Sequence, residues 1–238
     1  MRIELSKRLQ AVAEMVTPGM RLADVGTDHG YIPIYLTQQG VIPSAIAMDI
    51  NKGPLAKAKE HIEEMGLSDK IETRLSDGLR QVSADEVDSM ITAGMGGGLV
   101  IHILSDQEET AKRLKELILQ PQSEIAKVRA YLNENGYRIV AEDMVYEDGK
   151  YYPMMKVVVG EAEAEAYSEE ELEYGKYLLS EKHPVLHQYL NWEIAHHKEI
   201  IETLKKQDSD KARERIAQLT EKIHGIEQIL KERYIDEV

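Results

Sequence analysis

The sequence predicts an α/β domain, whose mostly parallel sheet ends in an antiparallel hairpin, followed by a C-terminal α-helical coiled coil. Three observations predict this fold. Apolar strand-like runs alternate with helix-like segments up to residue 135, two β-rich runs flank an Asp-Gly turn, and seam residues recur at heptad spacing near the C-terminus. We therefore divide the chain into a domain of residues 1–160 and an acidic linker with a coiled coil over residues 161–238.

The alternating part begins with a helix within residues 1–17, which Pro18-Gly19 ends. Helices are clearest at Pro54–Met65 and Ser123–Asn135, and each is followed by a glycine suited to end it. Alternation of this kind implies a parallel sheet with helices on both faces. The strands are expected at Arg21–Val25, Ala45–Asp49, Ile71–Ser76, Ser89–Ala93 and Glu116–Gln120.

The end of the domain has a different pattern. Tyr137–Glu147 and Tyr151–Gly160 are rich in β-forming residues and are joined by a segment that contains Asp148-Gly149. Because Asp-Gly is a strong signal for a tight hairpin turn, these two runs are expected to pair antiparallel.

The C-terminal region carries two helical seams separated by residues 207–210. So short a break allows only an antiparallel reversal, with Asp208 or Ser209 as N-cap of the second helix. A single continuous helix is the alternative, and a shorter helix within residues 168–182 is expected to precede the pair. The seam positions are Leu190, Ile194, His197, Ile201 and Leu204, then Ala212, Ile216, Leu219, Ile223, Ile226 and Leu230.

The segment Leu22–Tyr31 has the pattern of a buried strand that stops at a glycine turn and opens into a helix. A second acidic strand end, Asp49, follows 23 residues after Gly26, and this spacing is typical of a Rossmann-like nucleotide pocket. A dinucleotide loop needs three glycines against a pyrophosphate. This loop has two glycines, and its carboxylates Asp24 and Asp28 would repel a pyrophosphate.

These details favour S-adenosylmethionine, which has no phosphate and carries a cationic amino group and a cationic sulfonium. Asp49 could accept hydrogen bonds from both ribose hydroxyls, and Asp77 could accept one from the adenine amino group. A terminal antiparallel hairpin is also characteristic of class I methyltransferases, whereas dehydrogenases usually lack it. The expected cofactor-binding residues are Asp24, Gly26, Thr27, Asp28, His29, Gly30, Asp49, Ile50, Asp77, Gly78, Leu79, Gly94, Met95 and Gly96.

The fourth strand runs into a glycine-rich segment, Thr92–Gly98. Amino-methylating enzymes often carry an Asn- or Asp-Pro-Pro-aromatic motif at this place. Glycine and methionine supply neither an acid, a base nor an aromatic ring, so the catalytic polar group must come from elsewhere. The candidates are Asp28, His29 and Tyr31 at the mouth of the first loop. The plainer alternatives are a solvated loop for His29 and helix packing for Tyr31.

Composition limits the protein classes. The chain of 238 residues has no cysteine, which excludes disulfides and thiolate metal sites, and His196-His197 point to different helix faces, so no metal is expected. No apolar run reaches the roughly 20 residues that span a bilayer, and a cytoplasmic location is expected. The net charge of −14 argues against a polyanionic partner. Seven acids lie within residues 161–173, however, so a local basic face elsewhere is compatible with it.

Several motifs together resemble those of the bacterial tRNA (adenine-22, N1) methyltransferases over nearly the whole chain. They are Val25–Pro33, Ala47–Ile50, Ser76–Leu79 and Ala93–Gly97, with Leu5–Leu9, the Gly149–Tyr152 hairpin and the C-terminal coiled coil. The resemblance implies methyl transfer from S-adenosylmethionine to N1 of an adenine in tRNA, near the D-arm. Asp28 would stabilise the methylated cation, and Tyr31 would stack on or position the exposed base.

Two other classes stay open. A small-molecule methyltransferase would show the same pocket motifs, although it would not need a projecting coiled coil. In a nonenzymatic binding module, the C-terminal helices would dock a partner protein and the glycine loop would be merely structural; a cofactor-binding measurement would separate it from the enzymes. No obligate protein partner is evident from the sequence.

Overall fold

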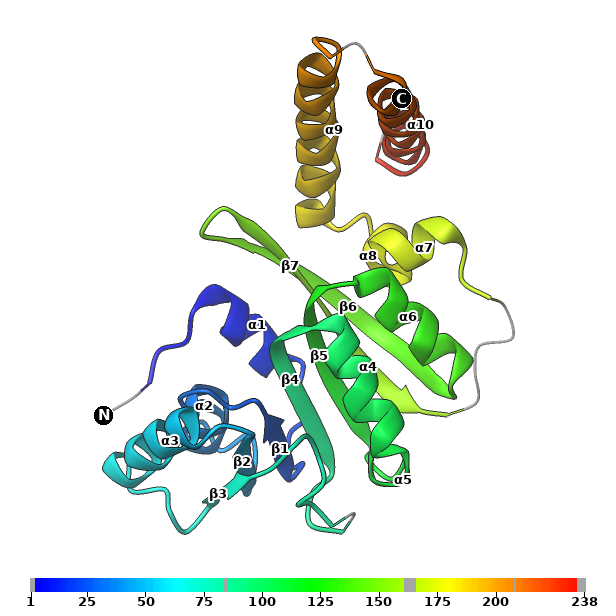
Figure 1. Cartoon of the computed structure of the whole chain (residues 1–238). Helices are drawn as coiled ribbons and strands as arrows, with labels where there is room; N and C mark the ends of the chain where they lie inside the picture. Colours follow the sequence, from blue (N-terminus) through cyan, green and yellow to red (C-terminus); the bar gives the residue numbers. More distant parts are fainter. Residues whose placement is uncertain (1–2, 84, 161–165, 208, 235–238) are drawn as a thin grey trace. The chain divides into compact units, whose positions relative to one another are not determined.

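The structure is a computed structural model that describes residues 3–83, 85–160, 166–207 and 209–234. By its internal contacts the chain forms two compact units, the first ending at Lys176 and the second beginning at Tyr177 (Figure 1). Each helix in these described ranges is too short or too polar to serve as a membrane span.

Within the described residues, the first unit contains a seven-stranded sheet in the order β3-β2-β1-β4-β5-β7-β6 (Figure 1). Strands β1 to β5 pair parallel, and β7 pairs antiparallel with both β5 and β6. The mostly parallel sheet with a terminal antiparallel hairpin is therefore confirmed. The strands are β1 (Leu22–Val25), β2 (Ala45–Asp49), β3 (Ile71–Leu75), β4 (Ser89–Gly96), β5 (Glu116–Ser123), β6 (Tyr137–Glu147) and β7 (Lys150–Val159).

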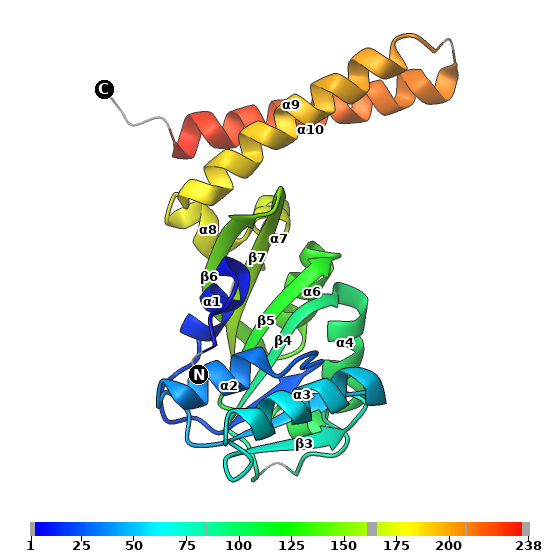
Figure 2. The same ribbon diagram turned by 90° about the vertical axis from the view of Figure 1, so that its left-hand side faces the viewer.

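Helices cover both faces of this sheet. On one face α1, α2 and α3 pack around a buried apolar cluster that includes Leu22, Ile91 and Ile118. On the other face α4 and α6 pack against each other and against β4 and β5 (Figure 2). The helices of the first unit are α1 (Lys7–Glu14), α2 (Tyr31–Gln38), α3 (Lys52–Glu64), α4 (Gly97–Asp106), α5 (Glu108–Ala111), α6 (Ile125–Glu134) and α7 (Glu169–Tyr174).

The parallel strands end at one edge of the sheet. Val25 at the end of β1 pairs with Met48 of β2 on one side and with Thr92 of β4 on the other. The loops that follow β1, β2, β3 and β4 therefore meet at this carboxyl edge, where ligands bind in open α/β sheets.

The second unit is a helical hairpin of α9 (Pro184–Leu204) and α10 (Asp210–Arg233), which lie side by side (Figure 2). Ile201, Leu219 and Ile223 form a buried cluster between them, so the reversal is confirmed and the single continuous helix is excluded. The hydroxyl of Ser209 accepts a hydrogen bond from the Ala212 N–H, as expected of an N-cap. Asp208, the other N-cap candidate, lies outside the described residues, and coiled-coil packing of the pair stays a prediction.

The segment before the hairpin differs from the single helix expected within residues 168–182. It forms α7 and α8 (Lys176–Ser180), separated by Gly175, whose φ is 95°. The guanidinium of Arg129 donates to two carbonyls at the end of α7 and pairs at 2.8 Å with the Glu142 carboxylate, both side chains being buried. This pair holds α7 on the first unit, because unpaired carbonyls and charges would be costly there. Residues 161–165 of the expected linker lie outside the described residues.

Candidate active site

Two cavities among the described residues open at the carboxyl edge of the sheet and share Gly26. The larger, of about 250 Å³, is lined by Val25, Gly26, Asp49, Ile50, Asn51, Ser76, Asp77, Gly78, Met95, Leu99 and Ile103. The smaller, of about 90 Å³, is lined by Arg8, Leu9, Asp24, Gly26, Thr27, Asp28, Tyr31, Ile32 and Ala93. Because they share a residue, the two cavities lie next to each other at this edge.

Gly26 is required where the two cavities meet. Its φ is 75°, and the N–H groups of Gly26 and Thr27 both donate to the carbonyl of Met48 at 2.8 Å. A Cβ atom on Gly26 would collide with the methyl group of Met95. The glycine therefore permits both the left-handed turn and the close approach of Met95, whose side chain lies over the junction.

Asp49 lies at the end of β2 and lines the larger cavity. Its Oδ1 accepts a hydrogen bond of 2.7 Å from the N–H of Asn51, which fixes the orientation of the carboxylate. Acceptor capacity remains on this fixed group for a ribose diol. Next to it Ile50 is 62% exposed, so it offers an apolar surface at the rim of the cavity.

Asp77 and Gly78 follow the neighbouring strand β3 and line the same cavity, and Gln107 holds their backbone. The Gln107 amide donates to the Asp77 carbonyl at 3.1 Å and accepts a hydrogen bond from the N–H of Leu79. A Cβ atom on Gly78, whose φ is 62°, would lie 2.5 Å from Gln107 Oε1. No local pattern pointed to Gln107, because it follows α4 and reaches this turn only through the fold.

Asp24 is buried at the wall of the smaller cavity. The pKa of its carboxyl is raised to about 6, chiefly because the group is buried; the Thr27 hydroxyl, which donates at 2.6 Å, lowers this pKa, and the nearby Asp49 raises it. A ligand cation beside Asp24 would favour its ionised form. The smaller cavity is therefore suited to the positively charged end of a ligand.

The three predicted catalytic residues gather at the mouth of this cavity. Asp28 has a φ of 48° and a side chain that is 75% exposed, and His29 Nε2 lies 3.6 Å from its Oδ1. The rings of His29, Tyr31 and His61 stack on one another at centroid distances of 5.2 to 5.6 Å. His61 also contacts the His29 carbonyl through Nδ1 at 3.0 Å. Sequence reasoning missed His61, because it lies on α3 among ordinary helix residues.

Arg8 is a second residue that sequence reasoning did not assign to the site. It lies on α1, and its Nη1 donates to Gln120 Oε1 at 2.8 Å, while its guanidinium lies 5.4 Å from the centre of the Tyr152 ring. These contacts aim a cation at the smaller cavity. The α1 helix and β5 are brought together only by the sheet, so no local pattern pointed to this pair.

The remaining predicted cofactor residues contribute backbone or packing rather than lining side chains. Gly30, with a φ of 72°, is the N-cap of α2 and packs against Ala58. Gly96 is the N-cap of α4. Gly94, with a φ of 83°, lies beside Arg8 at the end of β4. Leu79 is buried in the core. The structure therefore brings the predicted set to one edge of the sheet, although five of its members, His29, Gly30, Leu79, Gly94 and Gly96, line neither cavity.

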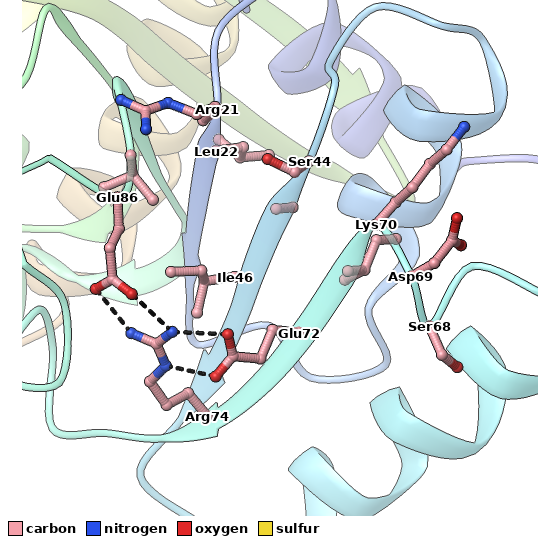
Figure 3. A pocket seen from close by; sticks show the side chains of 13 residues that line it. Arg21, Leu22, Ser44, Ile46, Ser68, Asp69, Lys70, Glu72, Arg74 and Glu86 are labelled. Atoms are coloured by element: carbon pink, nitrogen blue, oxygen red, sulfur yellow. Dashed lines mark hydrogen bonds and ion pairs between the residues drawn. The ribbon is translucent and has the colours of Figure 1, made fainter.

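A larger cavity, of about 530 Å³, lies at the amino ends of β1, β2 and β3 (Figure 3). Its Arg74 guanidinium is held between the Glu72 and Glu86 carboxylates at 2.7 and 3.0 Å. Its Arg21 pairs with Asp88 at 2.8 Å. These charges are satisfied within the protein, and the predicted site residues lie elsewhere, so the two smaller cavities form the candidate active site.

The donor set of the two cavities fits S-adenosylmethionine. The cavity of about 250 Å³ contains the Asp49 carboxylate, which is oriented for a diol, and it also has glycine-lined space and exposed apolar surface for a base. A buried carboxylate of raised pKa lies in the smaller cavity, where the cationic end of the cofactor would be accommodated. Among the described residues, no three His, Asp or Glu side chains are placed to hold a metal ion.

Comparisons with known proteins identify relatives of the whole chain. The family model of the tRNA (adenine(22)-N(1))-methyltransferases, TrmK, matches residues 22–228. The Bacillus subtilis (strain 168) tRNA (adenine(22)-N(1))-methyltransferase is 32% identical over 233 residues, which cover 96% of this chain and 98% of that protein. The crystal structure of Streptococcus pneumoniae Sp1610 in complex with S-adenosyl-L-methionine has a TM-score of 0.81 and 35% identity, covering 95% of this chain and 100% of that one. That of M. capricolum TrmK with S-adenosyl-homocysteine has a TM-score of 0.80 and 28% identity, covering 95% and 98%.

Proposed function

We propose a function from one premise: the chain belongs to the tRNA (adenine(22)-N(1))-methyltransferase family. It is an S-adenosylmethionine-dependent methyltransferase that acts on N1 of an adenine in tRNA. The observation that carries this proposal is the pair of cavities joined at Gly26, one with a carboxylate oriented for a ribose and one with a buried carboxylate for a cation.

In this proposal the cavity of about 250 Å³ holds the adenosine part of the cofactor. Asp49 accepts hydrogen bonds from the ribose hydroxyls, and Asp77 accepts one from the adenine amino group. Asp24 and Thr27 hold the charged amino-acid end in the smaller cavity. When bound, the cofactor supplies an electrophilic methyl group near Gly26, where the two cavities meet.

The chemistry of the step requires a free N1 lone pair. N1 attacks the methyl carbon in line, its lone pair forms the new N–C bond, and the S–C bond breaks. The base then carries the positive charge, which the Asp28 carboxylate stabilises in the transition state. N1 lies on the base-pairing edge, so the target base must leave its pair, and the stack of His29, Tyr31 and His61 offers aromatic surface for it.

The test is nucleoside mass spectrometry of an unmodified tRNA transcript after incubation with the full-length protein and labelled S-adenosylmethionine. We expect labelled 1-methyladenosine at position 22, and none in a matched transcript with guanosine there. Free adenosine serves as the substrate for the small-molecule alternative. Label on free adenosine but not on the transcript would favour that alternative, and no label on either would contradict a methyltransferase function.

The identity of the tRNA partners and the cellular location are finer points of this proposal. The helical hairpin of the second unit carries exposed basic residues to which we assign phosphate contacts, among them Lys211 and Arg215 on α10. A cytoplasmic location, as expected from the sequence, stays a prediction. Fractionation of cells that express the tagged chain checks it.

A further inference from the structure

Gln122 occupies an unusual place beside the smaller cavity. It is an exposed residue of β5, and its Nε2 lies 3.2 Å from the position that a Cβ atom would take on Gly94. Nη1 of Arg8 lies 3.4 Å from the same position. The pairing of β4 with β5 shifts register here, since Ala93 pairs with Gln120 and Met95 pairs with Pro121. Such bulges often re-aim side chains next to active sites.

A comparison with Gln120, on the same strand, shows what is distinctive about Gln122. The Gln120 amide is buried and fully engaged, since Oε1 accepts from Arg8 and Nε2 donates to the Pro121 carbonyl at 3.2 Å. The Gln122 amide makes no hydrogen bond within the described part of the chain. A side chain at Gly94 would press on this amide and on Arg8, so the glycine lets both lie close to the end of β4. Gln122 is exposed, so its amide has unused hydrogen-bonding capacity that a ligand can reach.

We propose that the Gln122 amide recognises the target adenine by pairing with its N6 and N7 edge. This inference rests on the function proposed above and names the residue that selects the base. The Gln122 Oε1 accepts a hydrogen bond from the N6 amino group, and its Nε2 donates one to N7. A glutamine amide matches this edge of adenine in a bidentate way, and each such pair discriminates strongly against other bases.

This arrangement leaves the reacting atom free. N1 lies on the far side of the amino group from N7, so a base held by Gln122 keeps its N1 lone pair unoccupied. The second N6 hydrogen remains available to a carboxylate, the role that this proposal gives to Asp28. Guanine presents two acceptors, O6 and N7, to the same amide and carries a hydrogen on N1, so it satisfies neither the recognition nor the chemistry.

Arg8 is a second residue that we expect to contact the target nucleotide. Its guanidinium is oriented by Gln120 and Tyr152 and lies beside the same open space as the Gln122 amide. A guanidinium at this place repels the positive charge of the methylated base and attracts anions. In this proposal Arg8 therefore binds the phosphate of the target nucleotide. Phosphate contacts position a nucleotide without reading its sequence, which leaves the reading to Gln122.

The test uses a tRNA transcript with either adenosine or 7-deazaadenosine at position 22. The 7-deaza base keeps N1 and N6 but lacks the N7 acceptor. For the wild-type protein we expect kcat/KM to fall roughly threefold to tenfold on the 7-deaza base, as for the loss of one hydrogen bond. Gln122→Leu should lose about tenfold or more on adenine. It should then show less than about a twofold further loss on 7-deazaadenine, because the contact to N7 is already absent.

A second variant inverts the preference. In Gln122→Glu a carboxylate faces N7 and repels its lone pair, so this variant should methylate 7-deazaadenine faster than adenine. Gln39→Leu is the matched control, because Gln39 is an exposed glutamine at the other end of α2 from the site, and it should behave as wild type. Calorimetry should show unchanged S-adenosylmethionine affinity in all three variants, since Gln122 lines neither cavity.

Two results would overturn the inference. One is a 7-deaza penalty of equal size in wild type and in Gln122→Leu, and the other is a Gln122→Leu activity on adenine within twofold of wild type. A failure of the proposed function looks different, because the wild-type protein would then leave the adenosine transcript unmethylated.

Discussion

The two ends of the central sheet present opposite kinds of cavity. The amino end has the larger space, yet its Arg74 is held by two carboxylates and its Arg21 by another. The carboxyl end has smaller spaces, and there Asp24 is buried with one hydroxyl, while Asp28 and Gln122 face outward. Hydrogen-bonding capacity that the protein does not use for itself therefore marks the site better than volume does.

The largest expected effect is at the carboxyl end. Asp28→Asn keeps the shape of the side chain and removes the charge that is proposed to stabilise the methylated base. We expect turnover to fall on the order of 100-fold while cofactor binding is largely spared. Single-turnover methylation of the tRNA transcript measures the first, and calorimetry measures the second. Turnover within about twofold of wild type would assign the carboxylate role to another residue.

The next effect concerns the ribose. Asp49→Ala removes the carboxylate that Asn51 orients, and loss of a charged acceptor typically costs about 1.5–3 kcal/mol. S-adenosylmethionine should therefore bind roughly tenfold or more weakly, with the fold intact by circular dichroism. Asp49→Asn is the conservative partner, which should recover part of the affinity because an amide oxygen still accepts. Unchanged affinity by calorimetry would remove Asp49 from the site.

A pH dependence separates Asp24 from the exposed carboxylates. The pKa of Asp24 is about 6 in the folded protein, above its ordinary value, because it is buried. The folded state therefore holds this proton more tightly than the unfolded chain, and the stabilisation present in acid is lost as pH rises from about 4 to about 6. A bound cation has the opposite preference, since it favours ionised Asp24.

Cofactor affinity should consequently weaken below about pH 6, by roughly fivefold to tenfold at pH 5 relative to pH 7. Calorimetry in buffers of different ionisation enthalpy should detect proton release on binding in this range. Asp24→Asn should bind more weakly and lose the pH dependence. Asp49→Ala should move the midpoint downward, because Asp49 raises the pKa of Asp24. A pH-independent affinity in the wild-type protein would exclude ionisation of Asp24 as part of binding.

The smallest effect is expected at the amino end. Arg74→Met breaks the contacts to Glu72 and Glu86, whose side chains are 60% and 38% exposed. Partly exposed ion pairs contribute little, so the loss of stability should be about 1 kcal/mol or less, measured by urea unfolding. Methylation kinetics should match those of wild type. A large loss of activity in this variant would break the contrast between the two ends of the sheet.

The sequence by itself determined the features that depend on neighbours along the chain. Asp49 and Asp77 could be identified because each lies at or just after a predicted strand. The carboxyl edge of a parallel sheet brings together the residues at these strand ends. The Asp148-Gly149 turn has positive φ angles of 49° and 77°, as the hairpin requires. The reversal between α9 and α10 likewise follows from a break too short for any other path.

The tertiary structure decided what distant segments contribute. Arg8, His61, Gln107 and Gln122 come from two helices, the residue after a helix, and the end of a strand, and nothing in their local sequence distinguishes them from surface residues. The division of α7 from α8 has a local signal in Gly175, which ends α7 with a φ of 95° and which the sequence analysis did not use. The tertiary structure adds a second cause, the buried Arg129 and Glu142 pair, which captures the carbonyls of α7. Periodicity and turn chemistry act over a few residues, whereas hydrogen bonds and charges are satisfied only by whichever groups the folded chain brings within reach.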